Sequence, residues 1–123
     1  MVIVDDKTFQ EMIDKALESL PGVHAKSIAN IAILYADEPS QQQRSELSLR
    51  HDQTLFGLYE GVPLPRRQGQ TRLLPDKITL FKLPLARASA TLNDLQENIR
   101  HTLWHEIGHY YGLDHARIRE LEN

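Results

Sequence analysis

The chain has 123 residues, of which 41% are hydrophobic and 25% charged, and its formal net charge is −3 at pH 7. This length predicts a single domain over residues 1–123 with a core of modest size. The negative charge argues against a general nucleic-acid-binding protein, which is normally basic. The absence of cysteine excludes disulfides and thiolate ligands and fits a reducing compartment. We see neither a secretory signal nor an apolar run that could span a membrane, so we expect a cytoplasmic location.

The chain up to residue 85 is predicted to form a helix, three strands and a polar loop. Helical spacing of apolar side chains predicts a helix over residues 8–20, with Thr8 and Glu11 spaced as a capping box. Residues 37–53 are polar and rich in glutamine and serine, which predicts a surface loop that could include one helical turn. Three strands are predicted: residues 27–36, which are β-branched and apolar, residues 54–64, which alternate loosely, and residues 77–85.

Glycine and proline modify two of these strands. Gly57 or Gly61 could mark a bulge in the second strand, because glycine inside a strand is often found there. Pro84 should stop the third strand, because proline lacks the N–H that a ladder needs. A helix followed by strands and a second helix predicts the α+β class with a small sheet of about three strands.

The second long helix is predicted to start near Ser89 or Thr91 and to run to about Tyr111. Thr91 and Asp94 have the spacing of a capping pair. Gly112 follows where a helix commonly turns left-handed and ends, and the remaining tail should form one or two further helical turns. One apolar stripe runs along this helix at steps of three and four residues: Leu92, Leu95, Ile99, Leu103, Ile107 and Tyr110.

The same helix carries the chain's strongest chemical signal, the stretch HEIGHYYGLDH. His105 and His109 are four residues apart, so both imidazoles lie on one helix face, roughly opposite the apolar stripe. A rigid helix can present two such nitrogens to zinc, and catalytic zinc usually takes three protein ligands. Gly112 lets the chain reverse, which could bring His115 back to the pair. The pattern H-E-x-x-H-x-x-G-x-x-H is complete and therefore predicts a metal site.

Glu106 lies directly beside the predicted metal pair. Its expected role is that of a general base, taking a proton from water that a metal has made acidic. Another interpretation remains open, in which Glu106 is only a solvated or supporting carboxylate. Three histidines suit zinc best, although nickel, copper or cobalt would also bind.

These residues resemble a known family. The stretch HEIGHYYGLDH is similar to the zinc signature of the zincin-like metallopeptidases in its extended metzincin form, and ALESLPG, GLYEGVPL and LPDKITLF resemble the minimal zincins, a branch of small bacterial proteins. The resemblance implies an α+β domain with a small sheet, a backing N-terminal helix and a motif helix crossing it. It also implies Zn²⁺ as the cofactor, His105, His109 and His115 as its ligands, and Glu106 as the catalytic base. The position of the third ligand varies in this branch, so Asp114 could replace His115.

We therefore expect a zinc-dependent peptidase that acts on a peptide or protein substrate, without nucleic-acid or membrane partners. The alternative is a zinc-binding, non-proteolytic structural or interaction module. Metzincins place a methionine-containing turn after the third ligand, whereas the methionines here are Met1 and Met12, and eight residues follow His115. Substrate and oligomeric state are not readable from the sequence.

Overall fold

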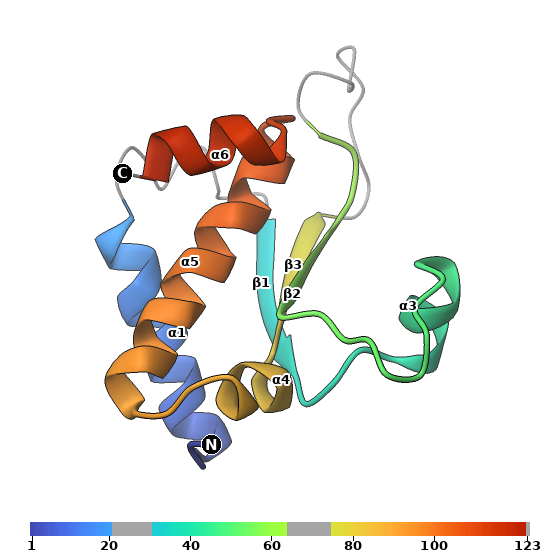
Figure 1. Ribbon diagram of the computed structural model, residues 1–123. Helices are drawn as coiled ribbons and strands as arrows, with labels where there is room; N and C mark the ends of the chain where they lie inside the picture. Colours follow the sequence, from blue (N-terminus) through green and yellow to red (C-terminus); the bar gives the residue numbers. More distant parts are fainter. Residues whose placement is uncertain (21–30, 64–74, 123) are drawn as a thin grey trace.

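A three-stranded sheet with two long helices packed against it forms the centre of the structure (Figure 1). This computed structural model describes residues 1–20, 31–63 and 75–122, apart from the side chains of His115 and Glu122. Its helices and strands are α1 (Asp6–Ser19), β1 (Ile31–Ala36), α3 (Gln41–Glu46), β2 (Gly57–Glu60), β3 (Asp76–Phe81), α4 (Lys82–Arg87), α5 (Leu92–Tyr110) and α6 (His115–Glu122). The predicted α+β class, with a small sheet and helices near both ends, is confirmed. Within the described ranges, no helix is both long and apolar enough to cross a membrane.

The sheet has the strand order β1-β3-β2, so β3 is its central strand. β3 pairs in parallel with β1, where Ile33 lies opposite Ile78, and antiparallel with β2, where Leu58 lies opposite Thr79. The central strand is buried from Ile78 to Phe81, which explains its continuous apolar sequence. β2 is left as an edge strand, and this edge lies beside α5.

The start of α1 differs from the prediction. Asp5, not Thr8, caps the helix: its carboxylate accepts a hydrogen bond from the Thr8 N–H at 2.8 Å, and the helix begins at Asp6. Thr8 and Asp5 are both good cap residues, and the earlier one gives the longer helix. The helix ends at Ser19, close to the predicted end.

The third strand is shorter than predicted. β3 stops at Phe81, and Lys82–Arg87 forms the helix α4 instead of continuing the strand. Pro84 lies in the first turn of this helix, where its missing N–H leaves no helical hydrogen bond unmade. Leu85 and Ala86, which a strand would point to opposite faces, are both buried. The strand therefore ends before Pro84, as a change from strand to helix at Lys82.

The polar segment between β1 and β2 contains the short helix α3. Ser40 accepts from the Gln43 N–H while the Gln43 side chain accepts from the Ser40 N–H, which is a complete capping box. This agrees with the predicted surface segment with a helical turn. The predicted bulge at Gly57 is wrong, because β2 and β3 pair one to one from Gly57 to Glu60. A Cβ at Gly57 would meet the Thr102 methyl carbon at 2.7 Å, so this glycine permits the close approach of β2 to α5.

The helix that carries the motif was predicted well. Thr91 and Asp94 form a capping box, and α5 ends at Tyr110, after which Gly112 adopts a φ of 78°. Leu92 is the exception to the stripe, because it is 54% exposed at the start of the helix. The rest of the predicted stripe is buried against α1 and the sheet: Leu95, Ile99, Leu103, Ile107 and Tyr110.

Gly108 allows α6 to pack on α5 behind the motif. A Cβ at this position would meet Ile118 Cγ1 at 2.4 Å and Cδ1 at 2.6 Å, and the Ile118 side chain is buried. We expect Gly108→Ala to destabilise the protein by about 1–3 kcal/mol through overpacking, although alanine is the better helix former. Urea unfolding of the two proteins measures this difference.

The double variant Gly108→Ala/Ile118→Ala is the control for this prediction. Shortening Ile118 removes the atoms that the new methyl group would meet. In the Ile118→Ala background, Gly108→Ala should therefore be neutral or stabilise by up to about 1 kcal/mol, from helix propensity alone. An equal loss of stability in both backgrounds would show that packing between α5 and α6 is not the cause.

Candidate metal centre

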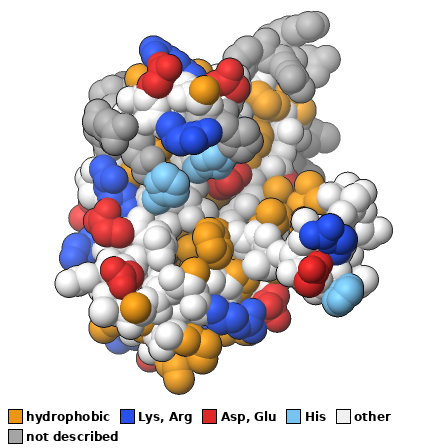
Figure 2. Space-filling model, viewed as in Figure 1, with side chains coloured by type: hydrophobic (Ala, Val, Ile, Leu, Met, Phe, Trp, Pro, Cys, Tyr) orange, Lys and Arg blue, Asp and Glu red, His pale blue; other side chains and the backbone are white. Residues whose placement is uncertain are grey.

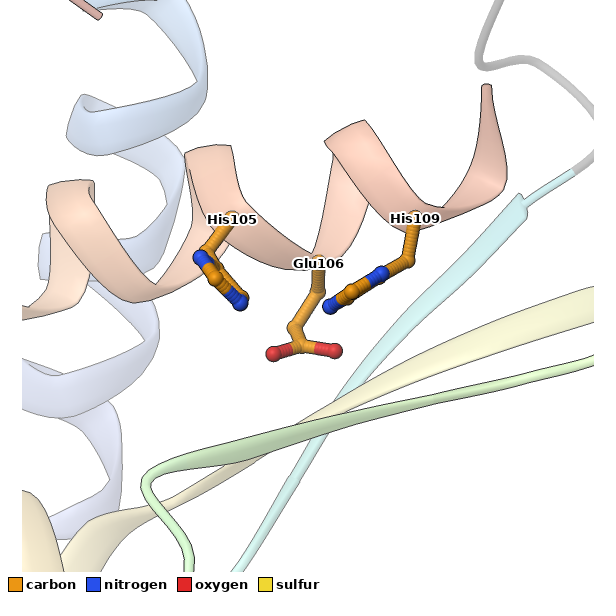
Figure 3. Close-up of side chains that lie close together, drawn as sticks. All are labelled: His105, Glu106 and His109. Atoms are coloured by element: carbon orange, nitrogen blue, oxygen red, sulfur yellow. The ribbon is translucent and has the colours of Figure 1, made fainter. Parts of the chain in front are cut away.

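Two histidines and one glutamate of α5 converge on a single point. His105, Glu106 and His109 each offer a ligand atom, and these three atoms all lie within 4.8 Å of one another. The two imidazole rings have centroids 4.7 Å apart and are inclined at 80°. In Figure 3 the three side chains project from the same side of α5 toward the strands, with the carboxylate between the rings. The helical spacing alone accounts for this pairing of the two imidazoles.

The cluster lines a cavity rather than an open helix face. His105 and His109 are half-buried, and with Glu106 they line a cavity of about 730 Å³. Figure 2 shows histidine side chains (pale blue) beside an acidic one (red) in a hollow of the surface. The sequence placed both imidazoles opposite the apolar stripe, in open space. The structure instead places β2 and the segment before it across the hollow from them.

Glu106 is buried, which was not expected for a residue beside an exposed pair. Its exposed fraction is 9%, and its Oε1 accepts a hydrogen bond of 3.0 Å from the backbone N–H of Tyr59 in β2. Burial disfavours the charged carboxylate and raises the pKa of Glu106 to about 7, while the hydrogen bond from Tyr59 acts in the opposite direction. A carboxyl group with a pKa near neutrality can both take up and release a proton at physiological pH.

Tyr59 was not identified as a site residue from the sequence. Its hydroxyl donates to Asp76 Oδ2 at 2.6 Å, and its ring lies edge-on to Tyr110, with centroids 6.1 Å apart. These contacts hold β2 at the height where the Tyr59 N–H meets Glu106. The two residues are 47 positions apart. No local motif could have revealed the pairing, because it depends on the strand register.

The structure describes the backbone of the third predicted ligand, His115, but not its side chain. His115 begins α6, and its role as a ligand remains a prediction. Asp114, the alternative ligand, is exposed, and its Oδ1 accepts from the Arg117 N–H at 2.8 Å at the start of α6. This hydrogen bond gives Asp114 a capping role.

The donor set fits a transition metal. Imidazole nitrogens suit zinc, copper, nickel and iron, and a carboxylate beside them can bind directly or support a bound water. Two imidazoles on one rigid helix need little ordering to bind the same ion. Among the described side chains, His105, Glu106 and His109 form the group that could hold a metal ion.

In this α+β fold, one helix brings two histidines and a carboxylate to a cavity. Sites of this kind are found in metal-dependent hydrolases. The family model of the zincin-like metallopeptidases matches residues 28–123. The match covers more than half of the sequence, and the chain therefore belongs to the zincin-like metallopeptidase family, as the motif predicted. No curated protein matches the chain.

Proposed function

We propose that this protein is a zinc-dependent peptidase that cleaves peptide bonds in the cavity beneath α5. The main support is the convergence of His105, Glu106 and His109 within 4.8 Å in the lining of a cavity large enough for a peptide segment. Membership of a metallopeptidase family supports the same class of reaction. The substrate would be a peptide or an unstructured protein segment.

The metal would be held by His105 and His109, with His115 as the third ligand from the motif. A zinc ion in such a site supplies Lewis acidity, which makes water a stronger acid and a carbonyl carbon more electrophilic. The helix presents the two imidazoles at fixed spacing, and α6 begins at His115, directly after the bend at Gly112. The chain's own contribution here is to orient its ligands before the ion binds.

Glu106 would act as the general base and then as the general acid. Its carboxylate would accept a proton from water and later donate that proton to the departing amine. The Tyr59 N–H holds one carboxylate oxygen, and a carboxylate has enough lone pairs to accept a second proton donor. β2 would therefore orient the base, of which only 9% is exposed.

Metal analysis and a cleavage assay on the same samples test this proposal. Protein purified without a metal-affinity tag should contain about one zinc per chain, and the His105→Ala/His109→Ala protein should contain none. His101→Ala, the same change one turn earlier on α5, is the matched control and should keep its zinc. A fluorogenic peptide library should be cleaved by wild-type protein, and removal of zinc with a chelator should stop the cleavage. Zinc retention without any cleavage would contradict the peptidase and favour the non-proteolytic module.

A further inference from the structure

The short helix α6 depends on the motif helix α5 for its position. Figure 1 shows α6 (red) lying across the C-terminal end of α5. α6 has eight residues, and among its described side chains Ile118, 1% exposed, is the buried one. A helix of this length is not stable in water by itself. Its place in the fold is therefore set by the contacts that Ile118 makes with α5.

Two residues of α5 make these contacts, and each directly precedes a histidine of the pair. Trp104, before His105, donates a hydrogen bond from its Nε1–H to the backbone carbonyl of Ile118, with 3.1 Å between the two atoms. Gly108, before His109, leaves room for the Ile118 side chain, whose Cγ1 lies 2.4 Å from where a Cβ of residue 108 would be. α6 is thus held at two points, one helical turn apart, beside the two imidazoles.

The bend between the two helices carries this position to the metal centre. The Gly112 N–H donates to the His109 carbonyl at 2.9 Å, and Gly112 adopts a φ of 78°. α6 begins at His115, three residues before Ile118. Within a helix, residues three apart keep a fixed separation, so the contacts that hold Ile118 also hold the backbone of His115.

We propose that Trp104 and Ile118 are positioning residues of the metal centre, which dock α6 on α5 and so hold His115 ready to bind the ion. This rests on the proposed function, in which His115 is the third ligand. The apparent zinc affinity is then proportional to the fraction of molecules in which α6 is docked. Linkage is reciprocal, so bound zinc favours the docked position of α6 by the same factor.

Zinc affinity, measured by competition with a chromophoric chelator, tests the inference. Ile118→Ala removes the buried side chain, and Trp104→Phe keeps an aromatic ring but removes the N–H that donates to α6. Each change should weaken zinc binding by about 10–100-fold, the usual loss when a group that orients a metal ligand is removed. Leu121→Ala is the matched control, because Leu121 lies on the same helix and is 42% exposed. It should keep the wild-type affinity.

The same changes in a His115→Ala background separate positioning from a general loss of stability. Without the third ligand, α6 has nothing to position, so Ile118→Ala and Trp104→Phe should alter the remaining zinc affinity by less than about 2-fold. An equal loss of affinity in the two backgrounds would show that these residues only stabilise the fold, which overturns the inference.

Tryptophan fluorescence reports the docking of α6 independently of activity, because Trp104 is the single tryptophan of the chain. In metal-free Ile118→Ala protein, the emission should lie at longer wavelength than in wild-type protein, since the indole meets more water. Saturating zinc should reverse this shift, as the reciprocal linkage requires. The emission of Leu121→Ala should match that of the wild-type protein. A shift that zinc does not reverse would contradict the coupling.

The outcomes distinguish this inference from the proposed function. Zinc binding with the expected losses, but without any peptide cleavage, supports the positioning role and contradicts the peptidase. Peptide cleavage with the same zinc affinity in the wild-type, Ile118→Ala and Trp104→Phe proteins overturns the positioning role and leaves the peptidase intact. A wild-type protein that binds no zinc contradicts both.

Discussion

Replacing Glu106 with glutamine is expected to slow peptide hydrolysis by roughly 10²–10⁴-fold, the usual contribution of a general base, while the zinc content stays unchanged. Glutamine has the same shape and can still accept the hydrogen bond that Tyr59 N–H gives to Glu106 at 3.0 Å. It cannot take a proton from water, so the loss should fall on kcat, with little change in KM. Steady-state cleavage of one fluorogenic peptide by the two zinc-loaded proteins measures both constants.

The matched control is Glu97→Gln, which makes the same change at an exposed position on α5. It should leave kcat and KM unchanged, because Glu97 does not line the cavity. Equal rates for wild-type and Glu106→Gln protein would rule out Glu106 as the base. A loss of rate with an equal loss of zinc would show that this carboxylate serves mainly as a ligand.

The same substitution is expected to stabilise the metal-free protein at pH 8 by about 3 kcal/mol. Burial raises the pKa of Glu106 from 4.5 to about 7, so the folded state keeps a proton that the unfolded state has already released. Between these two values the folded state binds more protons, and its stability therefore falls as the pH rises from about 4.5 to about 7. The size of the loss follows from about 1.4 kcal/mol for each pKa unit. Glutamine carries no charge at any pH and avoids the loss.

Urea unfolding in the presence of a chelator, at pH 5 and at pH 8, tests this expectation. The stability difference between Glu106→Gln and wild-type protein should be only about 1 kcal/mol at pH 5 and about 3 kcal/mol at pH 8. His105 and His109 face the carboxylate in both proteins, so their own titration contributes to both curves. A difference that is the same at the two pH values would contradict a near-neutral pKa for Glu106. The expected difference, larger at pH 8, would show that a carboxyl group suited to proton transfer lowers the stability of the fold.

Local signals accounted for the motif helix almost completely. The capping pair Thr91 and Asp94 defines where α5 begins, and Gly112 defines where it ends. Both signals act between residues three or four apart, as does the spacing that brings His105 and His109 together. Where two local signals competed, the sequence was less decisive: Asp5 caps α1 in place of Thr8. At Pro84 the strand prediction was wrong because proline is also compatible with the first turn of a helix.

By itself, then, the sequence determined the α+β class, the motif helix and the pair of imidazoles on one of its faces. Only the tertiary structure decided the surroundings of that pair. The burial of Glu106 and its hydrogen bond depend on β2, and the lining of the cavity includes Leu47 and Leu49, from the segment 37–53 that the sequence predicted to be a surface loop. The physical reason is the separation in sequence between the residues that interact. Helix periodicity and capping are set by near neighbours, whereas burial, pKa and cavity shape arise from contacts between residues such as Tyr59 and Glu106, which only the packing of β2 on α5 brings together.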